Sequence, residues 1–200
     1  MESLLRAVTK KGTLPAWSGS AGLIQQFLAA SEPTVAALAQ GTPMKKALKP
    51  YLRILMNLWP PFLGAGIRVK RLQGDWKAID VEMKPRRWNA NYFGTHYGGS
   101  LYSMSDPFIV LMLAESLGPG YIVWDKAASI RFRTPGRGTV SAEFRLAVDQ
   151  IEEIRQALEV AEKIERTFQV EIKEKSGMVV AEVEKLVHIR KKRQLAQREA

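Results

Sequence analysis

The sequence predicts an α+β domain in which one antiparallel sheet of about six strands wraps around one long buried helix. Several segments carry apolar residues at every second position, which is the pattern of a half-buried strand. The stretch from about Gly99 to Leu117 is apolar nearly all round, so this helix is expected to be buried. The buried helix follows two strands and precedes four, and this order favours one sheet wrapped around it.

The N-terminal part is predicted to lie outside this domain. Residues 1–43 are rich in Gly, Ser, Thr, Pro and Ala, which indicates a weakly structured extension. The composition changes at Met44, which we expect to be the true start, with the preceding residues dispensable. Residues 44–61 alternate apolar and basic residues at helical spacing, which predicts an amphipathic segment. Pro50 limits this helix to its later part, and Pro60-Pro61 is expected to end it.

Residues 62–190 are predicted to form the folded domain, and residues 191–200 a basic tail. Apolar residues alternate with polar ones in six stretches, of which the last four are expected to be antiparallel. These strands are predicted at 66–73, 76–84, 122–133, 140–146, 168–173 and 179–189. In the third of them, Ile130 and Phe132 are expected to point inward.

Two helices interrupt the strands. Pro107 is expected to distort the buried one, because proline cannot donate to the carbonyl of Ser103. The second helix has one apolar stripe and is predicted to lie on the surface. It is expected to begin at Asp149, since Glu152 three residues later completes an Asp-led capping box.

Composition excludes several classes of site. The chain of 200 residues is 46% hydrophobic, enough for a sizeable core. It has no cysteine, which excludes disulfides, thiolate metal sites and a cysteine nucleophile and suits a reducing cytoplasm. His96 and His188 are its only histidines, too few for a histidine-rich metal cluster. No apolar run is long enough to span a membrane, and no signal-peptide pattern opens the chain. We therefore expect a cytoplasmic protein without a metal.

The net charge of +10 is unevenly distributed along the chain. Residues 61–187 have a net charge of only +1, and the excess of Lys and Arg lies toward the two ends. Nucleic-acid binding is therefore not expected of the folded part. The basic run Arg190–Arg193 is interpreted as a solvated end.

The chemistry is expected at the start of the buried helix. Gly98 and Gly99 let the backbone approach a ligand closely, and the first turn of a helix has unpaired N–H groups. These groups suit a carbonyl oxygen that becomes anionic during attack. Asp106, between Met104 and Pro107, is expected to be poorly solvated, as catalytic bases often are.

With these residues in view, the chain resembles the hotdog-fold acyl-CoA thioesterases of the phenylacetate-pathway type. The run from Asn91 to Gly99, with Asp106 seven residues after the second glycine, is similar to their motif. Residues 128–138 are similar to their strand-turn-strand segment, and 62–190 look like an uncharacterised branch of the superfamily. The resemblance implies that Asn91 orders the loop, that Gly98 and Gly99 form the helix mouth, and that Asp106 is the catalytic carboxylate.

One position departs from the family's motif. The family's histidine directly precedes its glycine pair, and here Tyr97 takes that place while His96 is displaced by one. Either His96 serves from a shifted loop or the site lacks this histidine. The resemblance also implies contacts with the substrate. Coenzyme A is expected as part of that substrate, and no separate cofactor is expected. The expected substrate-binding residues are Tyr97, Ser100, Arg131, Arg133 and Arg137.

Each of these features has a structural alternative. The glycine pair could be only a tight turn into a helix, and Asp106 could only precede a proline in a distorted turn. His96 could be a hydrogen-bonding loop residue. Arg131, Arg133 and Arg137 could form a solvated strand face instead of meeting the phosphates of coenzyme A.

The most favoured function is hydrolysis of an acyl-CoA or acyl-carrier thioester. The alternative is a non-catalytic acyl- or lipid-binding protein that touches membranes through the basic amphipathic residues 44–59. A dehydratase of the same fold would require a well-placed histidine. Edge strands need cover, and the resemblance implies sites between subunits, so we expect a homodimer or a dimer of dimers.

Overall fold

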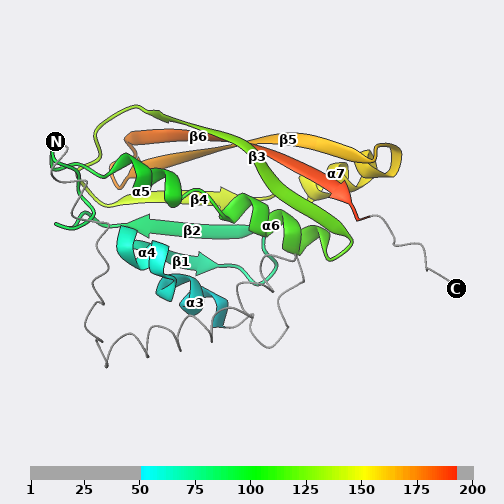
Figure 1. The fold of residues 1–200 in the computed structure, drawn as a ribbon, viewed down its shortest axis with the longest axis horizontal. Coiled ribbons are helices and arrows are strands. Elements are labelled where there is room, and N and C mark those ends of the chain that lie inside the picture. Colours follow the sequence, from blue (N-terminus) through cyan, green and yellow to red (C-terminus); the bar gives the residue numbers. More distant parts are fainter. Residues whose placement is uncertain (1–50, 193–200) are drawn as a thin grey trace, which may run out of the picture. The chain divides into compact units, whose positions relative to one another are not determined.

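Six strands form one antiparallel sheet, as the period-two pattern predicts (Figure 1). The computed structural model describes residues 51–192, so the expectations for 1–50 and 193–200 lie outside the described residues. The strands are β1 (Ile67–Leu72), β2 (Ala78–Met83), β3 (Tyr121–Phe132), β4 (Val140–Arg145), β5 (Lys163–Glu174) and β6 (Val179–Lys191). They lie in the order β1-β2-β4-β5-β6-β3, and all neighbours are antiparallel.

The predicted buried helix is present but broken into two. α5 (Gly98–Ser103) and α6 (Phe108–Leu117) lie along one face of the sheet (Figure 1). Pro107 stands at the break and has no N–H for the carbonyl of Ser103. That carbonyl instead accepts a hydrogen bond from the Asp106 N–H at 3.3 Å. The distortion predicted at Pro107 is therefore confirmed.

The core lies between this helix pair and the inner face of the sheet. α6 buries most of its apolar residues there, as expected for a helix that is apolar nearly all round. A row of three rings crosses the core, with Phe108 5.8 Å from Phe62 and 4.9 Å from Phe144 between ring centroids. All three side chains are almost completely buried.

The surface helix is α7 (Val148–Val160), which buries Ile151, Ile154 and Leu158 along the predicted stripe. Its start differs from the prediction. The helix begins one residue before Asp149, and Gln150 rather than Glu152 accepts the N–H of the capping residue Ala147, at 3.0 Å. The Asp-led capping box is therefore wrong.

The described part of the amphipathic segment forms two short helices, α3 (Leu52–Leu58) and α4 (Pro60–Ala65). Pro60-Pro61 ends the first, as predicted, but it also begins the second, because proline is well tolerated in the first turn of a helix. α3 covers the free edge of β1. The Asn57 amide donates to the Val69 carbonyl at 3.1 Å and accepts the Val69 N–H at 2.7 Å.

At the opposite edge of the sheet, β3 has no such cover from residues 51–192. Most of its side chains are exposed on the described chain, including Trp124, Ala127 and Ala128. Phe132 does lie on the inner face, since its ladder partner is the buried Ala181, but 56% of it remains exposed. An uncovered edge of this length is a ready template for pairing with another strand.

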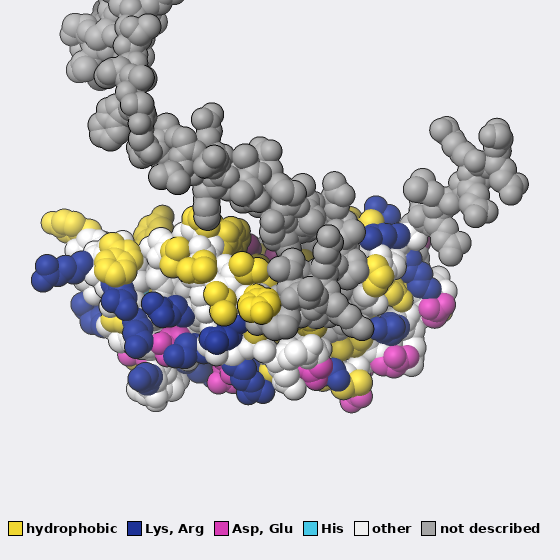
Figure 2. All heavy atoms as spheres, turned by 90° about the horizontal axis from the view of Figure 1, so that it is seen from below, with side chains coloured by type: hydrophobic (Ala, Val, Ile, Leu, Met, Phe, Trp, Pro, Cys, Tyr) yellow, Lys and Arg dark blue, Asp and Glu magenta, His cyan; other side chains and the backbone are white. Residues whose placement is uncertain are grey.

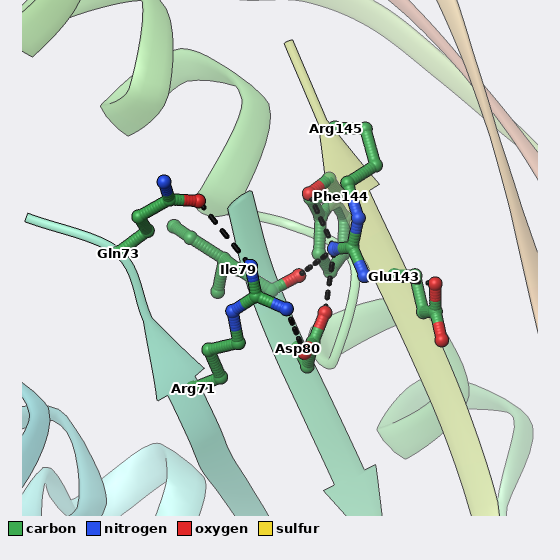
Figure 3. A network of polar contacts seen from close by, with 7 residues as sticks. All are labelled: Arg71, Gln73, Ile79, Asp80, Glu143, Phe144 and Arg145. Atoms are coloured by element: carbon green, nitrogen blue, oxygen red, sulfur yellow. Dashed lines mark hydrogen bonds and ion pairs between the residues drawn. The ribbon is translucent and has the colours of Figure 1, made fainter. Parts of the chain in front are cut away.

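Charged side chains tie β1, β2 and β4 together on the outer face of the sheet (Figure 3). The Arg145 guanidinium donates to the Asp80 carboxylate at 2.5 Å and to Glu143 at 2.8 Å. It also reaches the main-chain carbonyls of Ile79 and Phe144, at 3.3 and 2.9 Å. This network lies on the side away from α5 and α6 and stabilises the sheet without taking part in the candidate site.

Candidate active site

The loop that precedes α5 is ordered by Asn91, as the resemblance implies. Its side-chain oxygen accepts the N–H groups of Phe93 and Thr95, at 2.9 and 3.1 Å. Its side-chain nitrogen donates to the Thr95 hydroxyl at 2.8 Å. These bonds close a tight loop in which Gly94 has a positive φ of 68°, a conformation that favours glycine.

A second asparagine, Asn89, anchors the whole loop to the domain and was not found from the sequence. It is 4% exposed. Its side-chain nitrogen donates to the carbonyls of Ala65 and Lys84, both at 2.9 Å, and its oxygen accepts the Arg86 N–H at 2.7 Å. Its main-chain carbonyl accepts the Tyr97 N–H at 3.3 Å, immediately before α5. The start of α5 is therefore held by the packing of this side chain.

His96 is a buried loop hydrogen-bonder. Its Nε2 donates to the Gly138 carbonyl at 2.8 Å, which leaves Nδ1 buried without a hydrogen-bond partner. Its main-chain N–H donates to the Gly136 carbonyl at 3.0 Å. The hydrogen bonds of His96 therefore join the loop before α5 to the loop after β3, and none of them goes to Asp106.

Glu174 fixes the loop to which His96 binds. Its carboxylate accepts the N–H groups of Arg137 and Gly138, at 2.7 and 2.8 Å. These bonds, chiefly the one from Gly138, lower the pKa of Glu174. The Arg137 guanidinium in turn donates to the Phe93 carbonyl at 3.5 Å, so Arg137 lies beside the Asn91 loop.

The contribution of Glu174 to stability is expected to disappear in acid. Folding lowers the pKa of Glu174, so its carboxylate stabilises the fold fully at a pH above the pKa of the unfolded chain, about 4.3. This stabilisation is lost as the pH falls through the lower pKa of the folded chain. Thermal midpoints of the parent and Glu174→Gln should differ at pH 6 and converge toward pH 3. Glu171→Gln, at an exposed glutamate three residues away on the outer face, is the control. A constant difference between parent and Glu174→Gln across this range would contradict the prediction.

Gly98 and Gly99 are both packed under aromatic rings. A Cβ atom on Gly98 would lie 2.9 Å from the Phe132 ring, and one on Gly99 would lie 2.5 Å from the Tyr97 ring. Tyr97 is the N-cap of α5, and Ser100 is buried in its first turn. Within the described chain, no hydrogen bond uses the N–H groups of Gly98 and Gly99. The glycines thus permit close ring packing and also present two unpaired donors.

Asp106 stands at the break between α5 and α6. Its side chain is 54% exposed, so the expectation of a poorly solvated carboxylate is wrong for the single chain. The helix break is the reason, because it turns residue 106 out of the apolar face that a continuous helix would present. The exposed position leaves the carboxylate accessible to a ligand.

Lys185 of β6 holds Asp106 in place. This lysine is completely buried, and its ammonium lies 3.2 Å from Asp106 Oδ1 and 2.6 Å from Asp125 Oδ2. It also donates to the main-chain carbonyl of Asp106. Burial raises the pKa of Asp125, although the Lys185 hydrogen bond acts in the opposite direction. The sequence does carry a signal for this cluster, since Lys185 occupies an inward position in the alternation of β6.

Arg131 and Arg133 lie on the other side of the sheet. Arg131 is the ladder partner of Glu182, and Arg133 donates to Glu182 at 2.7 Å. Arg131 lines a hollow of about 670 Å³ on the outer face that also contains four glutamates. Within one chain, the structure therefore brings Arg137 to the motif loop but separates Arg131 and Arg133 from Asp106.

The sequence matches the family described as Domain of unknown function (DUF4442) over residues 47–189. No curated protein matches the chain. Among solved structures, a Pseudomonas aeruginosa protein of unknown function, described as a probable thioesterase, superposes with a TM-score of 0.64 at 23% identity. This match covers 76% of the present chain and 99% of that protein.

Two further structures superpose at lower similarity. A thioesterase from Haemophilus influenzae has a TM-score of 0.52 at 14% identity, covering 73% of this chain and 92% of its own. A protein of unknown function from Chlorobaculum tepidum has a TM-score of 0.57 at 14% identity, covering 77% and 99%. At these identities the comparisons show the fold, which is the predicted hotdog fold.

Proposed function

The chain belongs to the DUF4442 family, and from the geometry of its site we propose that it hydrolyses an acyl-CoA or acyl-carrier thioester. The observation that carries the proposal is the position of Asp106. Its carboxylate is anchored by one oxygen to Lys185 and is half exposed, at a break in the central helix of a hotdog domain. The absence of cysteine fits our further proposal that the protein works in the reducing cytoplasm.

In this reaction Asp106 activates a water molecule or attacks the thioester carbonyl itself. The carbonyl oxygen becomes an oxyanion, which the N–H groups of Gly98 and Gly99 stabilise. Collapse of this intermediate breaks the carbon–sulfur bond, and the thiolate leaves with the proton that Asp106 took from water. If Asp106 attacks directly, collapse leaves a mixed anhydride on its carboxylate, which a water molecule then hydrolyses while supplying the proton to the thiolate. Tyr97, Ser100 and Arg137, which lie around the helix start and its loop, are the proposed substrate contacts.

The separation between the two parts of the site favours an active site that is shared between two subunits. Gly98 and Asp106 are eight residues apart, which corresponds to roughly 12 Å along a helix at a regular rise. An attacked carbonyl needs both its oxyanion donors and its base at about 3 Å. We therefore propose that Gly98 and Gly99 of one chain act together with Asp106 of a partner chain.

The proposed dimer forms through β3, the uncovered edge. Light scattering should give a mass of at least twice the 22.4 kDa of one chain. Ala128→Asp, in the exposed strand, should shift the protein to a monomer, because a charged side chain on an edge strand opposes pairing with another strand. Val160→Asp, on the 93% exposed end of α7, is the control. A parent that stays monomeric at micromolar concentration would exclude both the dimer and the shared site.

A non-catalytic lipid-binding protein is the second candidate, and one surface favours it. α3 and α4 expose a cluster of large apolar side chains beside basic ones (Figure 2). The exposed apolar residues are Ile54, Leu55, Leu58, Trp59 and Leu63. A neighbouring hollow of about 260 Å³ has three basic residues and one acidic residue in its lining: Arg68, Lys84, Arg86 and Glu82. This pairing of apolar and basic groups suits an anionic membrane surface. No helix in the described residues has the length and apolar character needed to cross a membrane.

One assay separates the two candidates. A panel of acyl-CoA esters is offered to the full chain, and release of free thiol is followed over time. Release of thiol with saturation kinetics supports the hydrolase. A protein that binds acyl-CoA and sediments with anionic vesicles, yet releases no thiol from any ester, would favour the lipid-binding function.

A further inference from the structure

The burial of Lys185 is unusual because lysine is almost never fully buried unless it is paired. Its side chain is 0% exposed. An ammonium has three N–H donors and no acceptor. Here the three donors match three oxygens: Asp125 Oδ2, Asp106 Oδ1 and the Asp106 main-chain carbonyl. With every donor used, Lys185 has none left for a substrate, so its role must pass through its partners.

The main-chain contact shows why the lysine is placed here. In a continuous helix, the Asp106 carbonyl would accept the N–H of residue 110. At this break no such bond forms, and the first bond of α6 from outside the helix runs from the Leu111 N–H to the Pro107 carbonyl, at 3.0 Å. Lys185 supplies the missing donor to the Asp106 carbonyl. One ammonium thus satisfies the broken backbone and fixes the side chain of the same residue.

We propose that Lys185 is the positioning residue for Asp106: it holds one carboxylate oxygen and the main-chain carbonyl, and leaves the second carboxylate oxygen free to act. This inference rests on the proposed hydrolase function. A carboxylate on a free surface rotates among several rotamers, whereas catalysis requires one orientation. Anchoring two points of Asp106 to a buried group of β6 removes that freedom.

Asp125 balances the buried charge. It lies 2.6 Å from the ammonium, closer than the 3.2 Å of Asp106 Oδ1. Its other oxygen, Oδ1, is buried and has no hydrogen-bond partner among residues 51–192. The shortest carboxylate contact of Lys185 is therefore made to a residue that faces inward on β3. Asp106 is positioned by the lysine while Asp125 carries most of the charge compensation.

The test compares Lys185→Met with Lys126→Met in the full chain. Methionine keeps the length and apolar stem of lysine but removes the charge and the donors. Lys126 is the control, because it is an exposed lysine of β3 whose ammonium pairs with the Glu165 carboxylate of β5 at 2.6 Å. Lys185→Met should lower kcat by about 10²-fold with KM changed less than about threefold, as expected for a misplaced catalytic group. Lys126→Met should leave both values nearly unchanged.

A double variant distinguishes positioning from general structural damage. If Lys185 acts through Asp106, then adding Lys185→Met to Asp106→Asn should lower kcat by less than about threefold further, because the anchored group is already inactive. If the two substitutions multiply their full effects, Lys185 acts independently of Asp106 and the proposal is overturned. Should Lys185→Met not fold, the same comparisons are made in an Asp125→Asn background, which removes the unbalanced, partly buried carboxylate.

A second measurement decides the inference even if the proposed function fails. Amide hydrogen exchange over residues 104–111 should become about tenfold faster in Lys185→Met, because the break loses its anchor, and should not change in Lys126→Met. Absence of thiol release by the parent would reject the hydrolase but leave this expectation intact. Unchanged exchange over 104–111 in Lys185→Met would overturn the positioning role whatever the activity.

Discussion

Replacing Asp106 by asparagine is expected to lower the turnover number by about 10²–10⁴-fold, the usual loss when general-base assistance is removed. Asparagine has nearly the same shape as aspartate and can still accept a hydrogen bond from Lys185. It cannot take a proton from water or attack a carbonyl as a carboxylate does. The affinity for acyl-CoA should therefore stay nearly unchanged, because the proposed substrate contacts Tyr97, Ser100 and Arg137 remain.

Both quantities have to be measured on the parent and on the variant. Thiol release gives kcat, and equilibrium titration with a non-hydrolysable acyl-CoA analogue gives Kd. Asp149→Asn, at an exposed aspartate in the first turn of α7, controls for the loss of one negative charge. Robust hydrolysis by Asp106→Asn would show that another residue is the base.

Removing the Asn89 side chain is expected to lower the free energy of unfolding by about 2–4 kcal/mol. Alanine would leave the carbonyls of Ala65 and Lys84 and the N–H of Arg86 without their partner. A buried polar group that loses its hydrogen bond costs about 1–3 kcal/mol, and water entering the space left behind reduces the total. Urea denaturation at constant m-value measures the change.

Asn91→Ala is the matched control for this prediction. Asn91 is half-buried, and its hydrogen bonds stay within its own loop, so its loss should change stability less. It should instead impair substrate binding and turnover, because the loop leads directly into Gly98 and Gly99. Equal losses of stability for the two variants would mean that Asn89 has no special anchoring role.

The sheet and its helices could be predicted because buried apolar residues recur at a regular spacing along the sequence of each element. The inward direction of Ile130 and Phe132 is confirmed by their ladder partners, Val183 and Ala181. The start of α7 could not be predicted from an acidic residue alone. Gln150 reaches back to the main chain as well as a glutamate would, so the capping side chain is not unique in the sequence.

For the candidate site, the sequence carries information only on contacts between residues close together in the chain. Asn91 orders its own loop within five residues, so its spacing carries the information. Lys185 and Asp106 are 79 residues apart and meet only because β6 lies beneath the helix break. Asn89 bonds to Ala65, 24 residues earlier, through a contact that no periodic pattern marks. Long-range polar contacts of this kind depend on the finished fold.

The Asn57 amide is hydrogen-bonded to the main chain of Val69, and this contact limits how many chains can join the sheet. A sheet with two open edges can grow without limit, one chain after another, whereas the described residues leave this sheet a single open edge, at β3. Pairing of β3 with its own copy about a twofold axis uses that edge on both chains at once. Growth by strand addition then stops at two, and any larger assembly has to form by stacking the faces of finished pairs. One side-chain amide thus limits the sheet to a single partner chain by strand addition.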